Sequence, residues 1–164
     1  METVSELAEM VLQLLKKKNM HVTFVESCTG GMLASSLVSI SGASAVMEQA
    51  MVTYSNEAKK RLAGVKESTL EQYGAVSSQT AMEMAEGGAK RAECELCVSV
   101  TGVAGPGMEE DKPVGLVFLG IFFLGNVRAV ECHFLGNRQE IREAAVKKAF
   151  ELIMEELKEM EEKK

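Results

Sequence analysis

The sequence predicts an α/β protein, a three-layer α/β/α sandwich around a mixed sheet with a late antiparallel hairpin. Segments with helical periodicity alternate with short apolar runs in the first part of the chain. Two apolar runs then follow one another, separated by Gly125-Asn126, a dipeptide that suits a hairpin turn. A last helical segment ends the chain. A mixed sheet covered by helices on both faces accommodates this order.

Six segments carry the periodicity or the capping residues of helices. Apolar residues recur at helical spacing from Val4 to Leu15, and three lysines follow at the expected helix end. The other predicted helices cover residues 30–40, 56–62, 68–74, 80–91 and 138 to the tail. Asn56, Ser77 and Asn137 are the expected N-caps, because their side chains accept hydrogen bonds from the first free amides of a helix.

Five apolar runs are predicted strands, over residues 21–25, 51–54, 96–101, 114–123 and 127–134. Polar or glycine-containing segments follow the first three of them, at residues 27–31, 54–56 and 101–102. If these three strands are parallel, the three segments meet at one edge of the sheet. Ligands bind at this edge in open α/β folds, so we expect the site there.

Composition narrows the functional classes. The 164 residues are expected to form one domain, 1–164, and the formal net charge of −6 disfavours a nucleic-acid partner. We expect no membrane partner and a cytoplasmic location, since no run is long and apolar enough to span a bilayer and the N-terminus does not resemble a signal peptide. The four cysteines and two histidines do not have the spacing of a convincing metal site, so no metal or cofactor is expected. Cys94 and Cys97 form a C-x-x-C pair, which we interpret as ordinary small residues of the core or an edge.

Ser27, Cys28 and Thr29 are candidates for chemistry, because they lie where the first predicted strand gives way to a helix. Gly30 and Gly31 follow, and glycines allow a ligand to approach the backbone and its free N–H groups closely. The alternative is that Ser27 or Thr29 caps the helix. Adjacent residues in an extended run point to opposite sides, so Ser27 and Cys28 are not expected to share the site.

A serine needs a base to accept its proton, and neither histidine follows a strand suitably. Lys59 lies one turn into the helix after Tyr54, from which its amine could reach the same edge. It would have to be neutral, which requires burial or a neighbouring cation. The alternative is a solvated helix lysine. Cys28 is the rival nucleophile, and the sequence does not choose between the two.

Arg138 and Arg142 are four residues apart, so they share one face of the last helix. Two guanidinium groups on one face suit a phosphate group. The alternative is a pair of surface arginines that bridge Glu140 or Glu143.

The chain resembles the CinA C-terminal domain family, which includes nicotinamide-nucleotide amidohydrolases. Six motifs that occur in the family's order carry the resemblance: Val25-Glu26-Ser27-Cys28-Thr29-Gly30-Gly31, Val52-Thr53-Tyr54-Ser55-Asn56-Glu57-Ala58-Lys59, Gly74-Ala75-Val76-Ser77, Val100-Thr101-Gly102-Val103-Ala104-Gly105-Pro106, Lys112-Pro113-Val114-Gly115 and Gly136-Asn137-Arg138. The resemblance is to the stand-alone form of the family, so we expect no separate N-terminal domain of the kind that two-domain CinA proteins carry. Two departures affect substrate contacts: the loop 107–112 is shorter and more acidic than usual, and Asn137 replaces an aspartate.

The resemblance implies a metal-independent hydrolase that converts nicotinamide mononucleotide and water to nicotinic acid mononucleotide and ammonia, recycling pyridine nucleotides. It implies that Ser27 is the nucleophile and Lys59 the general base, with Ser44 as a second serine near them. It also carries substrate contacts onto Tyr54 and Thr101, next to Gly102, and a phosphate contact onto Arg138 or Arg142. Backbone N–H groups around Thr29 to Gly31 would stabilise the oxyanion.

Two further hypotheses remain. One is a non-catalytic nucleotide-binding or regulatory module related to competence or DNA damage, and the other is a cysteine hydrolase that uses Cys28. The expected partners are a small-molecule nucleotide and a second copy of the chain. The homodimer is expected because Met47, Met51, Met82 and Met84, among the 11 methionines of the chain, and the helices rich in small residues offer an adaptable apolar surface. The alternative is that these methionines fill one core.

Overall fold

The computed structural model describes residues 1–163 and contains one five-stranded mixed sheet. The strands are β1 (Val22–Glu26), β2 (Met51–Val52), β3 (Leu96–Gly102), β4 (Leu116–Phe123) and β5 (Asn126–His133). They lie in the order β2-β1-β3-β4-β5, in which β1 is parallel to both neighbours, and β4 is antiparallel to β3 and β5. The predicted mixed sheet with a late antiparallel hairpin is therefore confirmed.

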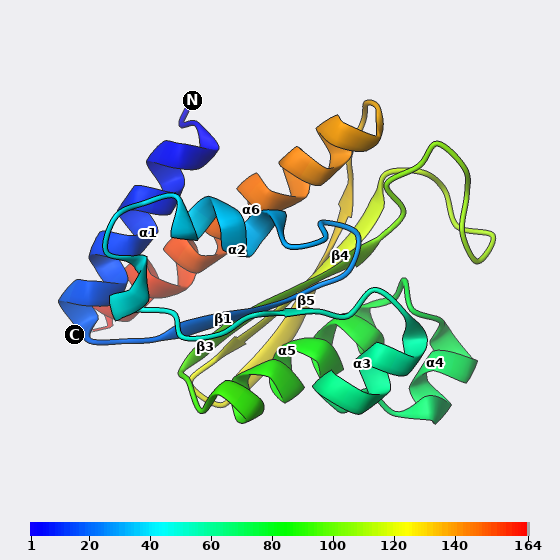
Figure 1. Cartoon of the computed structure of the whole chain (residues 1–164), viewed down its shortest axis with the longest axis horizontal. Coiled ribbons are helices and arrows are strands. Elements are labelled where there is room, and N and C mark those ends of the chain that lie inside the picture. Colours follow the sequence, from blue (N-terminus) through cyan, green and yellow to red (C-terminus); the bar gives the residue numbers. More distant parts are fainter. Residues whose placement is uncertain (164) are drawn as a thin grey trace.

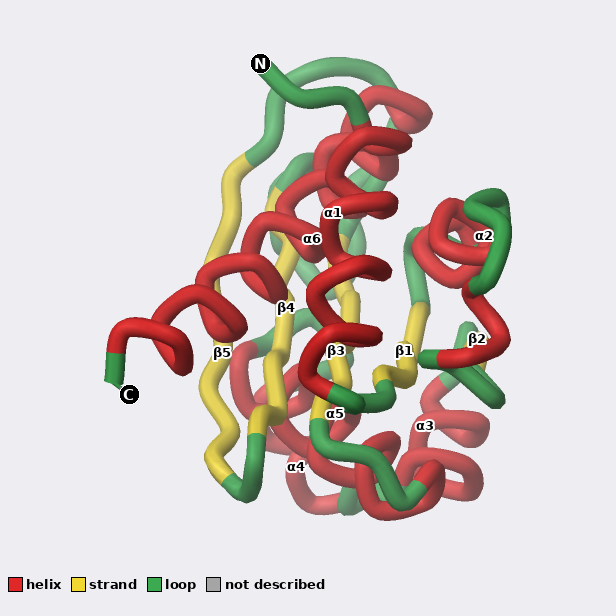
Figure 2. The backbone as a smooth tube through the Cα atoms, turned by 90° about the vertical axis from the view of Figure 1, so that its left-hand side faces the viewer, coloured by secondary structure: helices red, strands yellow, loops and turns green. Residues whose placement is uncertain are grey.

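Helices cover both faces of this sheet (Figure 1). One layer contains α1 (Val4–Lys18), α2 (Met32–Val38) and α6 (Arg138–Glu162), and the other contains α3 (Asn56–Ala63), α4 (Glu67–Tyr73) and α5 (Ser78–Ala92). A short 3-10 turn, η1 (Ala43–Ala45), precedes β2. Figure 2 shows α1 and α6 on one side of the strands and α5 on the other, so the three-layer prediction is correct. No helix in the described part of the chain is long and apolar enough to cross a membrane.

The first and last helices form by the local rules that the sequence suggested. Thr3 and Glu6 make a reciprocal capping box at the start of α1, and Asn137 and Glu140 make the same arrangement at the start of α6. Each box satisfies amides that the helix itself leaves free. The two helices then bury their apolar faces against the sheet and each other, where Phe24 of β1 meets Phe150 of α6 edge to face at 6.5 Å.

The central strand β3 is buried along its whole length, because helices cover both of its faces. On the α5 side the close packing depends on two glycines. A Cβ at Gly88 would lie 2.4 Å from a methyl group of Val25, and one at Gly120 would lie 2.2 Å from the Ala81 carbonyl oxygen. These two positions let α5 lie directly on the sheet, which fixes the layer that carries α3.

Several predicted boundaries were wrong by a few residues. The second helix starts at Met32 rather than residue 30, because Gly30 and Gly31 have φ values of +58° and +101°. β2 ends at Val52, and Ser55 rather than Asn56 caps α3 by accepting from the Ala58 amide. The other differences are small: α4 starts at residue 67, β4 at 116 and β5 at 126. Ser77 caps α5 as predicted.

Candidate active site

Ser27 lies directly beyond the carboxyl end of β1, where its amide still donates to the carbonyl of Val100 on β3 at 2.9 Å. Lys59 approaches it from the first turns of α3. The Lys59 Nζ atom is 3.0 Å from Ser27 Oγ and donates to the Thr53 carbonyl at 2.8 Å. The structure therefore brings together two groups that are 32 residues apart in the chain, in hydrogen-bonding geometry for proton transfer.

The amine of Lys59 is enclosed by protein, with only 2% of the residue exposed. Burial lowers the pKa of this amine below its ordinary value, while Cys28, Glu110 and Glu109 act in the opposite direction. Its neighbour Lys60 is different, because its amine pairs with Glu57 at 3.1 Å on the surface and its pKa is raised. Lys59 is thus a buried lysine with a lowered pKa beside Ser27, whereas Lys60 is a paired surface lysine.

Cys28 borders the same space as Ser27, which corrects the expectation that the two would point apart. The chain has already left the extended conformation of β1 at this point, so the alternation rule no longer applies. Burial raises the pKa of the Cys28 thiol to about 11, with Arg142 partly opposing the rise. The thiol is therefore protonated near neutral pH and is a poor nucleophile.

A cavity of about 90 Å³ opens next to these residues. Its wall is formed by Ser27, Cys28, Tyr54, Gly102, Ala104, Glu109 and Arg138. Pockets for whole drug-sized ligands measure about 300–1,000 Å³, so this one has room for only part of a mononucleotide. The remainder of such a ligand would lie across the mouth of the cavity.

The two arginines of α6 have different positions. Arg138 is in the cavity wall, where one guanidinium nitrogen donates to the Gly105 carbonyl at 2.6 Å and another to the Tyr54 hydroxyl at 3.3 Å. Arg142 instead donates to the carbonyls of Cys28 and Thr29, both at 3.0 Å. Arg142 braces the turn that carries Ser27, whereas Arg138 faces the space that a ligand would enter.

A family model described as the CinA C-terminal domain matches residues 4–157. The chain belongs to this family. A protein of Clostridium novyi named for competence and damage induction is 48% identical over 152 residues, which cover 92% of this chain and 37% of that protein. A relative from Clostridium botulinum is 44% identical over 155 residues, with 38% of its length covered. The chain thus spans little more than a third of these curated relatives.

Solved structures of CinA proteins share the fold. The competence/damage inducible protein CihA of Agrobacterium tumefaciens is 42% identical, with a TM-score of 0.89 over 92% of this chain and 93% of that one. A CinA superfamily protein of Klebsiella pneumoniae is 31% identical, with a TM-score of 0.94 over 96% and 99%. The sheet and helices that position Ser27 and Lys59 are therefore the CinA arrangement.

Glu26 also shapes the site of this CinA domain, although the sequence did not predict a role for it. It is fully buried at the end of β1, and its carboxylate accepts from the amides of Leu33 at 2.8 Å and Ala34 at 3.0 Å. The start of α2 is therefore filled by the protein's own anion, which corrects the expectation of an open anion site there. A charged residue at the end of an apolar run was the available signal.

The turn after Ser27 also differs from the expectation. The Gly30 amide donates to the Ser27 carbonyl at 3.0 Å, so it is engaged within the turn. Thr29 is fully buried, and its hydroxyl has no hydrogen-bond partner among the residues described. The cavity wall given above includes none of Thr29, Gly30 and Gly31. Their side of the turn lies against Arg142, whose guanidinium is 3.5 Å from where a Cβ of Gly30 would be.

Two other expected site residues lie elsewhere in the CinA domain. Thr101 is buried and donates to the Ala75 carbonyl at 2.7 Å, so it anchors a neighbouring segment while Gly102 borders the cavity. Ser44 is exposed in η1, next to Val46, whose carbonyl accepts from the Val22 amide at the amino end of β1. β1 is five residues long, about 16 Å at 3.3 Å per residue. In a single copy of the chain, Ser44 is therefore too far from Ser27 to take part in a reaction at that hydroxyl.

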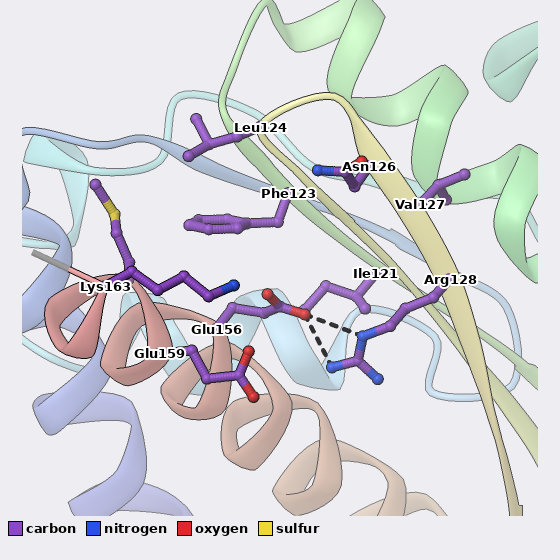
Figure 3. Close-up of a pocket in the computed structure, with 10 residues that line it drawn as sticks. Ile121, Phe123, Leu124, Asn126, Val127, Arg128, Glu156, Glu159 and Lys163 are labelled. Carbon is purple, nitrogen blue, oxygen red and sulfur yellow. Dashed lines mark hydrogen bonds and ion pairs between the residues drawn. The ribbon is translucent and has the colours of Figure 1, made fainter.

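A larger cavity of about 360 Å³ lies at the opposite end of the sheet, between the β4–β5 hairpin and the end of α6 (Figure 3). Arg128 crosses it to pair with Glu156 at 2.9 Å, and Phe123 forms part of its wall. This cavity is larger than the one beside Ser27, but its wall contains no serine, cysteine or histidine and no buried base. We assign the site to the smaller cavity because the reactive groups converge there.

Within residues 1–163, no three His, Cys, Asp or Glu side chains gather in a way that could hold a metal ion. The four cysteines are unpaired, and burial raises the pKa of Cys94 to about 11 and that of Cys97 well above its usual value. The two reactive groups in contact at the candidate site are the Ser27 hydroxyl and the buried amine of Lys59.

Proposed function

We propose that this CinA domain hydrolyses the carboxamide of nicotinamide mononucleotide to give nicotinic acid mononucleotide and ammonia. The observation that carries the proposal is the buried pair of Ser27 Oγ and Lys59 Nζ, 3.0 Å apart at the wall of a cavity. Burying a charged amine costs several kcal/mol unless it is paired, so burial favours the neutral form of Lys59. A neutral amine beside a hydroxyl is the arrangement that serine–lysine amide hydrolysis requires.

In the first step, neutral Lys59 accepts the proton of the Ser27 hydroxyl while Ser27 Oγ attacks the carboxamide carbon. The Thr53 carbonyl accepts from Lys59 Nζ and so fixes the direction of the amine's lone pair. The resulting oxyanion needs N–H donors that face the cavity, and we do not assign this role to Thr29, Gly30 or Gly31, because none of the three borders the cavity and the Gly30 amide is engaged within the turn. Protonated Lys59 then delivers its proton to the amide nitrogen as the C–N bond breaks, so that ammonia leaves and the acyl-enzyme ester on Ser27 remains.

The second step hydrolyses the acyl-enzyme. Lys59, neutral again, accepts a proton from a water molecule that attacks the ester carbonyl, and Ser27 regains its proton as it leaves. Both steps use the same pair of residues, and each returns Lys59 to its starting protonation state. No cofactor enters this scheme.

Arg138 is the proposed phosphate contact. Of the two candidate arginines it is the one in the cavity wall, whereas Arg142 is committed to the carbonyls of Cys28 and Thr29. A phosphate would exchange the contacts of Arg138 with Gly105 and Tyr54 for charge-assisted hydrogen bonds. This role fits a cavity that admits the ring and its amide while the phosphate lies near the mouth.

A second candidate function is a nucleotide-binding or regulatory module without turnover, which the relatives' names for competence and damage induction favour. Such a module has no use for a lysine with a lowered pKa beside a serine. A binding site would be equally well served by a charged lysine at the surface.

Ammonia release distinguishes the two functions. Purified protein is incubated with nicotinamide mononucleotide, ammonia is followed by a coupled assay, and nicotinic acid mononucleotide is identified by chromatography. We expect equal amounts of the two products, and much slower release from nicotinamide riboside, which lacks the phosphate. Binding of the mononucleotide without release of ammonia would reject the hydrolase in favour of the binding module.

A further inference from the structure

The acidic loop between β3 and β4 contains a tight turn with an uncommon backbone. The Lys112 amide donates to the Glu109 carbonyl at 2.8 Å, and the two residues between them have φ values of +54° at Glu110 and +59° at Asp111. Left-handed backbone is uncommon outside glycine, asparagine and aspartate. Such a conformation persists where surrounding contacts over-determine it, and it points to a function.

Contacts to the end of α4 and to the segment that leads from it to α5 hold this turn in place. The Glu110 carboxylate accepts from the amides of Ala75 at 2.8 Å and Val76 at 2.9 Å. Lys112 Nζ donates to the carbonyls of Tyr73, at 2.9 Å, and Val76. Burial opposes ionisation of Glu110, but these amides and Lys112 lower its pKa overall, so the carboxylate stays charged. Both ends of the turn are thereby fastened to residues 73–76.

The fastened turn places Glu109 in the wall of the catalytic cavity. Glu109 has no anchoring role of its own in this turn beyond its main-chain contact with Lys112. Its charge reaches the reacting groups, since it acts to raise the pKa of both Lys59 and Cys28. The wall therefore carries one cation, Arg138, and one anion, Glu109.

We propose that Glu109 is a specificity-determining residue that selects carboxamides carried by a cationic ring. This inference rests on the proposed function for the identity of the ligand. The pyridinium ring of nicotinamide mononucleotide bears a permanent positive charge, and its phosphate is an anion. Glu109 and Arg138 provide the complementary charges, so the oxidised nucleotide is favoured over uncharged amides and over the reduced, neutral dihydronicotinamide ring.

The expected effect is moderate, because Glu109 is exposed at the cavity mouth. Water and salt screen its field, so the preference should be about tenfold at low ionic strength and should shrink as salt is added. A carboxylate near Lys59 also opposes the lowering of that amine's pKa. Glu109 therefore acts against the neutral form of Lys59, and we interpret its presence in the cavity wall as serving ligand selection rather than catalysis.

Binding is the sharper test, because reduction of the ring also changes the reactivity of the amide. Dissociation constants are measured by calorimetry for nicotinamide mononucleotide and its dihydro form, in a Ser27→Ala background that prevents turnover. We expect this background to bind the oxidised form about tenfold more tightly, and Glu109→Gln in the same background to remove the preference. Asp111→Asn, on the same turn but outside the cavity wall, is the matched control and should retain it.

The outcomes separate this inference from the proposed function. If the preference survives Glu109→Gln, or if neither form binds, the assignment of Glu109 is overturned. If Glu109→Gln removes the preference while the Ser27 protein releases no ammonia from nicotinamide mononucleotide, the charge selection stands and the hydrolase fails.

Discussion

The two cavities at opposite ends of the sheet differ in a way that size does not reveal. The cavity of about 360 Å³ at the β4–β5 hairpin contains a surface ion pair between Arg128 and Glu156. The cavity of about 90 Å³ at the other end has Ser27 in its wall and the buried amine of Lys59 behind it. The comparison shows that chemical capability follows from the convergence and burial of titratable groups rather than from empty volume.

The topology of the sheet explains this difference. β1, β2 and β3 are parallel, so the segments that leave their carboxyl ends meet at one edge and bring Ser27, Thr53 and Gly102 together. The opposite end, at Leu96 and Phe123, is closed by a tight hairpin turn at Leu124 and Gly125. A tight turn has no spare residues with which to build a site.

The largest expected effect comes from removing the nucleophile. Ser27→Ala should lower kcat for ammonia release by at least about 10³-fold, because no other group on the cavity wall combines a hydroxyl with a neighbouring base. The melting temperature should change little. Cys28→Ser should retain activity within about tenfold, and the reverse ranking of the two variants would assign catalysis to the thiol.

Loss of the base should have the next largest effect. Lys59→Ala is expected to reduce kcat by about 10²–10⁴-fold with little change in KM, because a base acts in the transition state. In the wild type, kcat should fall as pH drops below the lowered pKa of Lys59, since protonation removes the lone pair. Lys60→Ala is the matched control, and an acid limb that persists unchanged in Lys59→Ala would mean that another group is the base.

The arginines of α6 allow the comparison to be sharpened within one site. Arg138→Ala should raise KM for nicotinamide mononucleotide about 10- to 100-fold through loss of phosphate hydrogen bonds, with a small effect on kcat. Arg142→Ala should instead lower kcat and the melting temperature, because the carbonyls of Cys28 and Thr29 lose their donor. Equal KM effects in the two variants would show that the different positions of Arg138 and Arg142 do not correspond to different roles.

The smallest effects should come from the larger cavity. Arg128→Ala removes a surface pair with Glu156 and is expected to change the free energy of unfolding by about 1 kcal/mol or less. Turnover of nicotinamide mononucleotide should be unchanged. A loss of activity comparable with that of Lys59→Ala would show that the two ends of the sheet are coupled, and the simple comparison would be wrong.

Local signals account for what the sequence predicted well. Helix caps at Ser77 and Asn137, the late hairpin and the strand-to-helix turn at Ser27 depend on near neighbours in the chain. The failures depend on contacts between distant segments. Thr101 bonds to Ala75, 26 residues away, and the placement of Ser44 depends on where the chain after α2 rejoins the sheet at Val22. Periodicity and spacing carry no information about such contacts.

Lys59 illustrates the same difference between local and long-range information at the site. Its helix and its approach to the polar edge of the sheet could be predicted from spacing, but its burial could not. Enclosure depends on the tertiary structure, in which α3 packs against α5 and the Thr53 carbonyl accepts from the amine. Only the folded chain shows that this lysine is shielded while Lys60 beside it pairs with Glu57 at the surface.

The protonation state of Lys59 tests the central claim most directly. Lysine labelled with ¹³C at Cε is titrated by NMR between about pH 6 and 11, and the Lys59 resonance is identified by its absence in Lys59→Met. We expect that resonance to titrate clearly below the usual lysine pKa of about 10.4, and below the resonance of Lys60, whose pKa is raised by Glu57. A Lys59 resonance that titrates at or above about 10.4 would mean a charged amine at neutral pH, and the serine–lysine mechanism would be contradicted.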